Sequence, residues 1–175
     1  MTALIALLIL CAGIGLGVFF SGGYTTLDAP TPSRATSTEP AAANKETSVE
    51  TSITLDYSGK NLSQFPKEIL SQKNTEKLDL SDNALTGALP AEIHELQNLQ
   101  ILDISNNQMT GLPAELGHLS HLRILDASNN RLTGLPYELG DLANLEILDL
   151  TGNAVSMQDL EIIRAKLRPS TQIRY

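Results

Sequence analysis

A short phrase that returns at a nearly constant interval is the feature that most constrains this chain of 175 residues. The phrase is Leu-Asp-x-Ser, with threonine closing the last copy, and its copies begin at Leu55, Leu78, Leu102, Leu125 and Leu148. The intervals are 23, 24, 23 and 23 residues. A unit of this length cannot bury an apolar core alone, so successive units must stack on one another. The sequence therefore predicts a solenoid, and its 30 leucines supply the core that seven aromatic residues could not build.

Each copy of the phrase predicts a short strand followed by a turn. Apolar and polar residues alternate, as around Leu102 and Ile104, which is typical of a strand with one buried face. An asparagine follows four of the strands at the same place, and its amide can both donate to and accept from the turning backbone. We therefore expect a structural asparagine ladder, formed by Asn83, Asn107, Asn130 and Asn153.

The two fullest copies carry a family resemblance. The pattern Leu-x-x-Leu-x-Leu-x-x-Asn-x-Leu is filled in one copy by Leu99, Leu102, Ile104, Asn107 and Met109, and in the next by Leu122, Leu125, Ala127, Asn130 and Leu132. From Ile53 to about Tyr175, the chain thus resembles the leucine-rich repeat family. The resemblance implies an α/β solenoid, a short horseshoe of about five repeats. A parallel β-sheet would form its concave face, and irregular or short helical segments its convex face.

Both ends of the repeat region depart from the pattern, as terminal caps do. The first coil, residues 53–77, carries polar residues where the following coils carry leucine. At the other end, residues 154–175, the usual Leu-Pro pair is replaced by the segment 158–167, whose apolar residues at spacings of three and four predict an amphipathic helix. Residues 171–175 are expected to return as a last edge strand.

Residues 1–23 are expected to form a hydrophobic helix that anchors the chain in a membrane. The 18 residues 3–20 carry no charge and, at about 1.5 Å per residue, match a hydrocarbon core of about 30 Å. No lysine or arginine precedes them, so the positive region usual in a cleaved signal is missing, which favours a retained single-pass signal anchor. From the usual behaviour of such anchors we expect the repeat domain to be extracytoplasmic. Signal cleavage followed by secretion is the alternative. A lipoprotein signal acylated at Cys11 is disfavoured because Leu10, which is not small, precedes it.

Two further features accompany this segment. Gly13 and Gly17 form a Gly-x-x-x-Gly pair that would let two membrane helices associate weakly, although glycine is common in membrane helices in any case. Residues 24–52 are rich in serine, threonine, proline and alanine, a composition that cannot bury enough apolar surface to offset the entropy of ordering. They are therefore expected to be a disordered linker.

The family resemblance implies that strand residues between the leucines face the concave side and contact a partner. The expected partner-binding residues are Lys77, Ile101, Asp103, Ile124, Asp126, Ile147 and Asp149. The aspartate column has two interpretations: a cation ladder, or carboxylates that hydrogen-bond to neighbouring hydroxyls and backbone. We favour the second, because ions such as calcium need six or more converging oxygens.

Charge and motifs exclude several classes of function. The formal charge of −8 argues against nucleic-acid binding through phosphate neutralisation, and residues 78–157 hold 11 acids against two bases. No phosphate-binding loop, nucleophile elbow or metal-ligand spacing is found, so we expect no cofactor, no metal and no catalysis. The sequence predicts a membrane-tethered module that binds a protein or peptide on its concave face. A structural or adhesive scaffold of the cell envelope is the alternative.

Overall fold

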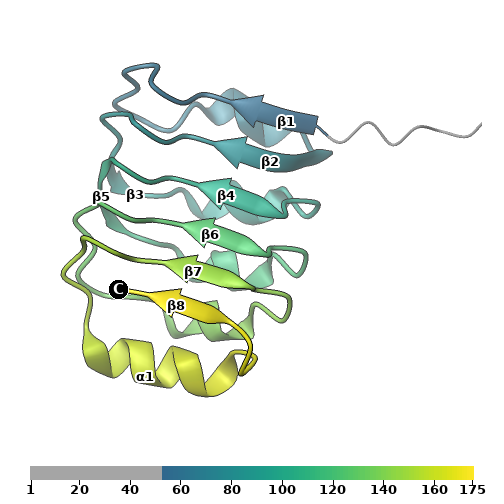
Figure 1. Ribbon diagram of the computed structural model, residues 1–175. Coiled ribbons are helices and arrows are strands. Elements are labelled where there is room, and N and C mark those ends of the chain that lie inside the picture. Colours follow the sequence, from purple (N-terminus) through teal and green to yellow (C-terminus); the bar gives the residue numbers. More distant parts are fainter. Residues whose placement is uncertain (1–52) are drawn as a thin grey trace, which may run out of the picture. The chain divides into compact units, whose positions relative to one another are not determined.

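The computed structural model describes residues 53–175, which form a solenoid of stacked coils (Figure 1). One flank is a six-stranded, wholly parallel sheet in the order β1-β2-β4-β6-β7-β8. Its strands are β1 (Ile53–Asp56), β2 (Thr75–Asp79), β4 (Ile101–Asp103), β6 (Ile124–Asp126), β7 (Ile147–Asp149) and β8 (Gln172–Arg174). The solenoid predicted from the repeat and the parallel sheet implied by the family resemblance are both confirmed.

The core consists of aliphatic columns that run the length of the solenoid. Leu78, Leu102, Leu125 and Leu148 pair in register across four strands, and all are fully buried. A second inward column lies two residues further along the chain and contains Leu80, Ile104, Ala127 and Leu150. Each buried leucine side chain is worth about 1.5–3 kcal/mol relative to exposure. Stacking therefore stabilises coils that could not fold singly.

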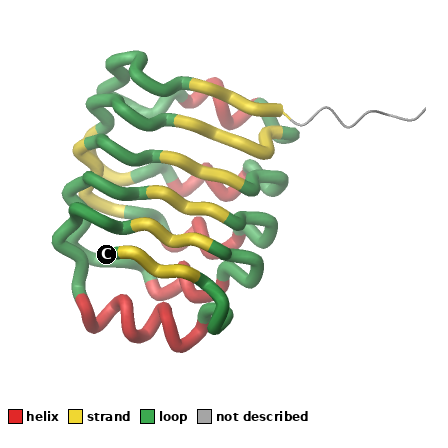
Figure 2. The backbone as a smooth tube through the Cα atoms, in the orientation of Figure 1, coloured by secondary structure: helices red, strands yellow, loops and turns green. Residues whose placement is uncertain are grey.

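Short 3-10 helices form the opposite flank and appear behind the strands in Figure 2. They are η1 (Lys67–Ser71), η2 (Ala91–Glu95), η3 (Ala114–His118) and η4 (Tyr137–Asp141). Each begins directly after a proline, and each buries an apolar residue in the core: Ile69, Ile93, Leu116 and Leu139, respectively. The coils approach closely here, because a Cβ placed on Gly117 would lie 2.4 Å from the carbonyl oxygen of Glu138.

The asparagines after the strands join each coil to the coil before it. Asn107 Oδ1 accepts from the backbone N–H of Leu85 at 2.9 Å, and its Nδ2 donates to the carbonyl oxygens of Leu80 and Ile104 at 3.0 and 3.1 Å. The other three make corresponding bonds to their preceding coils; they are Asn83, Asn130 and Asn153. Each of these bonds satisfies backbone groups that the turn leaves unpaired.

The residue before each asparagine adopts a left-handed backbone conformation. The values of φ are 55° at Asp82, 53° at Asn106 and Asn129, and 76° at Gly152. Asparagine and aspartate tolerate this region better than most side chains, and glycine tolerates it without cost. At Gly152 a side chain is excluded for a second reason, because a Cβ there would lie 2.4 Å from Asn129 Oδ1.

A second, two-stranded sheet was not predicted from the sequence. It pairs β3 (Thr86–Ala88) with β5 (Gln108–Gly111) in parallel, and it lies where these two coils turn away from the main sheet (Figure 1). The coil that contains β3 is the one with the 24-residue interval. The pairing shifts register between Gly87 and Ala88, where it skips Thr110 of β5.

The C-terminal coil is closed by helix α1 (Met157–Lys166) and strand β8. Ser156 caps the helix, since its Oγ accepts from the backbone N–H of Asp159 at 3.3 Å. Leu160 and Ile163 are fully buried, and Ile173 packs against the core from β8. The helix begins and ends one residue earlier than the expected segment 158–167.

The first coil buries one polar side chain in place of a leucine. Thr75 has no solvent exposure, and its hydroxyl donates to the carbonyl oxygen of Gln72 at 2.6 Å. Phe65 and Leu55 both pack against the core and are partly exposed. A buried hydroxyl is tolerated at this position because its hydrogen bond is made locally.

The predictions for residues 1–52 lie outside the described residues. They comprise the membrane anchor 1–23, the Gly13 and Gly17 pair, acylation at Cys11 and the linker 24–52. Within residues 53–175, no helix is both long and apolar enough to cross a membrane. The preceding hydrophobic helix therefore stays a prediction.

Candidate functional site

The solvent-facing side of the main sheet, called the sheet face below, carries most of the residues expected to bind a partner. Lys77, Ile101, Ile124 and Ile147 stand in register on β2, β4, β6 and β7. All four are partly exposed, whereas the leucine that follows each of them is buried. Neighbouring strands lie about 4.8 Å apart, so the three isoleucines form a continuous apolar stripe.

A row of aspartates runs beside this stripe and extends across five strands. It consists of Asp56, Asp79, Asp103, Asp126 and Asp149, which pair in register. In the first three, one carboxylate oxygen accepts from both the backbone N–H and the hydroxyl of the serine two residues later, at 2.6–3.1 Å. Asp126 and Asp149 each accept from the backbone N–H two residues later at 3.0 Å, and Asp149 also accepts from Arg174 at 3.2 Å. Every aspartate is thus bonded within its own strand end.

Cations neutralise the row near its ends but not at its centre. Arg174 on β8 lies 3.2 Å from Asp149 Oδ2, and Lys77 lies 3.9 Å from Asp79 Oδ2. Within residues 53–175, neither Asp103 nor Asp126 is in an ion pair. These two carboxylates therefore present negative charge directly beside the isoleucines of the same strands.

The pKa values within the row follow this arrangement. Burial, opposed by the hydrogen bonds from Ser105 and reinforced by Asp126 and Asp79, raises the pKa of Asp103. The hydrogen bonds from Ser58 lower the pKa of Asp56. At Asp149 burial is the largest single influence and acts upwards, but the hydrogen bonds from Thr151 and Arg174 together lower the pKa. The centre of the row is thus where an added cation would relieve the most unfavourable charge.

The row does not converge on a metal site. Among residues 53–175, no three histidine, cysteine, aspartate or glutamate side chains are grouped so that they could hold an ion. The histidines have other neighbours: His94 and His118 meet edge to face with ring centroids 6.1 Å apart, and His121 Nδ1 lies 2.9 Å from the carbonyl oxygen of Gln97. Hydrogen bonding to neighbouring hydroxyl and backbone groups accounts for the aspartates without a cation.

Sequence reasoning missed a polar pocket at the edge of the sheet face, called the edge pocket below. It has a volume of about 320 Å³ and is lined by Gln100, His121, Arg123, Asn144, Glu146 and Arg168. Arg123 pairs with Glu146 through two hydrogen bonds, of 2.9 and 3.1 Å. These two residues are 23 apart, so the repeat interval alone could have placed them side by side.

Comparisons with known proteins agree with this architecture. The family model described as a leucine-rich repeat region matches residues 76–165, slightly more than half of the chain. The chain belongs to the leucine-rich repeat family.

Relatives and similar structures include several receptors. Receptor like protein 22 of Arabidopsis thaliana is 46% identical over 54 residues, which cover 31% of this chain and 7% of that protein. Leucine-rich repeat-containing protein 10 of Bos taurus is 47% identical over 53 residues, covering 30% of this chain and 19% of that protein. The chain therefore spans less than a fifth of either relative's length.

Two solved structures resemble most of the described solenoid. The ectodomain of the receptor kinase SOBIR1 from Arabidopsis thaliana superposes with a TM-score of 0.57 at 31% identity, covering 71% of this chain and 68% of that one. The BIR3–SERK2 complex from the same plant gives a TM-score of 0.58 at 29% identity, covering 69% and 66%. The second of these structures is thus a complex of two proteins.

Proposed function

We propose that this chain is a non-catalytic interaction module that binds an extended protein or peptide segment on its sheet face. The observation that carries the proposal is the isoleucine stripe beside two carboxylates that form no ion pair within residues 53–175. A partner with apolar side chains flanked by lysine or arginine would bury the stripe and neutralise Asp103 and Asp126. The complex formed by a structural neighbour supports a role in protein recognition.

We further propose that residues 1–23 tether the module to a membrane and that the solenoid lies on the extracytoplasmic side. The 18 uncharged residues 3–20 motivate this part of the proposal. It is also supported by the similarity to a receptor ectodomain. Carbonate extraction of membranes from cells that produce the full chain tests the tether. Retention of the chain in the pellet is expected, and complete release into the supernatant would contradict the tether.

The binding proposal is tested with the full chain, immobilised in detergent micelles and exposed to a random linear peptide library. The selected peptides should be rich in apolar and basic residues. Their affinity should fall at least about 30-fold when Ile101, Ile124 and Ile147 are replaced together by serine, because each isoleucine loses its contact with the partner.

The matched control replaces three exposed threonines away from the sheet face with alanine: Thr86, Thr110 and Thr133. This variant should bind the same peptides with unchanged affinity. Thermal unfolding of both variants checks that the fold is intact. Equal binding by the serine variant and the wild type would place the contact elsewhere and overturn the proposal. Selection of no peptide, together with capture of envelope polysaccharide, would favour the adhesive alternative.

A further inference from the structure

We propose that the edge pocket is a carboxylate-binding subsite. A partner would then place an acidic group in the pocket, apolar groups on the isoleucine stripe and a basic group on the aspartate row. The inference deepens the proposed function and rests on it for the partner, but the pocket's own chemistry can be tested alone. Its ligand class is the carboxylate group.

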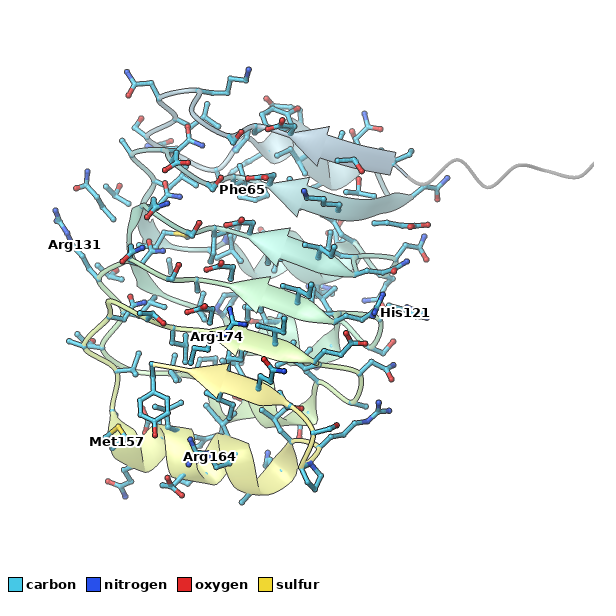
Figure 3. All side chains as sticks on the ribbon, in the orientation of Figure 1. Phe65, His121, Arg131, Met157, Arg164 and Arg174 are labelled. Atoms are coloured by element: carbon cyan, nitrogen blue, oxygen red, sulfur yellow. The ribbon has the colours of Figure 1, made fainter. Side chains whose placement is uncertain are left out.

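The pocket is continuous with the sheet face. Gln100, Arg123 and Glu146 directly precede Ile101, Ile124 and Ile147 in the chain, so its walls stand at the starting ends of β4, β6 and β7. Figure 3 shows His121 at this edge, whereas Arg131 points outwards at the opposite ends of the strands. A ligand that covers the isoleucine stripe therefore reaches the pocket without bending away from the sheet.

The charges in the pocket are unequal. Arg123 and Arg168 supply two guanidinium groups against the single carboxylate of Glu146. The hydrogen bond from Arg123, followed by the charges of Arg123 and Arg168, lowers the pKa of Glu146, so this acid stays ionised and already has its partner. The pocket therefore carries an excess of positive charge beside a stretch, residues 78–157, that holds 11 acids and two bases.

Arg168 supplies the charge that remains available. Within residues 53–175 it forms no ion pair, and its recorded hydrogen bond runs from Nη2 to the neutral Asn144 Oδ1 at 2.9 Å. A guanidinium has five N–H donors in a planar fork that matches the two oxygens of a carboxylate. The bond to Asn144 orients this fork while leaving donors for a ligand.

Other donors and the size of the pocket fit the same ligand. Gln100 brings an amide group, and Asn144 Nδ2 donates one N–H to the carbonyl oxygen of Ser120 at 2.8 Å and keeps the other. Arg123 contacts Glu146 through Nε and Nη2, which leaves Nη1 for an incoming oxygen. A volume of about 320 Å³ admits a carboxylate together with the aliphatic stem that carries it. The site thus suits an organic acid on a peptide better than a bare ion.

The arrangement also fixes the order of groups on the partner. Arg123 directly precedes β6, which carries Ile124 and Asp126, and the three residue steps from Arg123 to Asp126 span about 10 Å. A partner segment should therefore present an acidic group and a basic group about this far apart, with apolar side chains between them. The isoleucine stripe alone could not select a partner for either of these charged groups.

The test titrates three small probes into the full chain in detergent micelles and follows the arginine Nε–H signals by NMR. N-acetylglutamic acid α-amide carries only a side-chain carboxylate, N-acetylglutamine carries only an α-carboxylate, and N-acetylglutamine amide carries none. Saturable shifts at Arg123 and Arg168 are expected with at least one carboxylate probe and not with the amide. The tighter of the two acids shows whether a side chain or a chain terminus is the source.

Two variants sharpen the result. Arg168→Gln should weaken the binding of the acid at least about tenfold, because a charge-assisted hydrogen bond is lost. Glu146→Gln should strengthen it, because it removes the carboxylate that competes for Arg123, and a merely structural ion pair would not produce this gain. Arg131→Gln, at the other ends of the strands, is the matched control and should change nothing.

Equal shifts at Arg131 and Arg168, or binding that Arg168→Gln leaves unchanged, would reduce the effect to general charge screening and overturn the subsite. The probes need no natural partner, so their result is separate from that of the peptide selection. Binding of the acid without selection of any peptide would keep the subsite and remove the proposed function. Selected peptides whose binding is insensitive to Arg168→Gln would keep the proposed function and remove the subsite.

Discussion

Two polar columns run along this solenoid, and they use their hydrogen bonds in opposite ways. The asparagine ladder bonds between coils, from each amide to the backbone of the coil before it, and Asn107 and Asn130 are buried. In the aspartate row, each carboxylate accepts a hydrogen bond from the residue two positions later in its own coil. A polar column that joins coils holds the fold together, whereas one that bonds to itself leaves an outward oxygen for a partner.

The largest loss of stability should come from removing one asparagine of the ladder. Asn107→Ala removes a buried amide that serves backbone groups of two coils; the N–H of Leu85 loses its acceptor, and the carbonyl of Leu80 keeps only its bond from Asn83. We expect a loss of about 3 kcal/mol in the free energy of unfolding, measured by urea denaturation. Asp126→Asn, in the other column, should cost far less. Similar losses for both variants would remove the distinction between the columns.

A smaller loss of stability should follow when a side chain is added at the left-handed turn between the two columns. Gly152→Ala places a Cβ 2.4 Å from Asn129 Oδ1 on a backbone with φ of 76°. Strain and displacement of Asn129 should together cost about 1–2 kcal/mol, seen as a lower midpoint of thermal unfolding. The control Gly134→Ala, whose Cβ would meet its nearest atom at 3.8 Å, should leave the midpoint nearly unchanged.

Asp103→Asn should have a small effect that depends on pH. Because the pKa of Asp103 is raised in the folded chain, its carboxyl favours folding only when protonated, below the ordinary value of 3.8, and this contribution is lost as the pH rises through the folded pKa. At neutral pH the asparagine variant should therefore be slightly more stable, by less than about 1 kcal/mol given solvent screening. Denaturation at pH 7 and near pH 3 should show the gain shrinking in acid, and a gain that grows in acid would contradict this sign.

The smallest effect concerns the aspartate row and calcium. Each carboxylate already has one oxygen bonded to its own strand, and the residues are separated by the interstrand distance rather than converging. Millimolar calcium should leave the midpoint of thermal unfolding where it is. A rise that is reversed by a chelator would show that the row is a cation ladder after all.

The sequence predicts well those features that repeat. The buried leucines and the in-register position of each asparagine follow from the 23-residue interval alone. That the asparagines bond towards the preceding coil can be known only from the geometry of the coils. The strands β3 and β5 were missed because they are short, contain glycine and depend on a one-residue shift at Ala88. The edge pocket was missed because Arg168 comes from the C-terminal cap, where the interval no longer applies.

The proposed binding surface is tested most directly by photo-crosslinking from the full chain in cells that produce it. A photoreactive amino acid would replace Ile124 on the sheet face in one variant and Thr110, exposed away from it, in the other. Mass spectrometry of the products should identify a protein or peptide partner joined from position 124 and absent from position 110. Crosslinks from position 110 alone would contradict the assignment of binding to the sheet face.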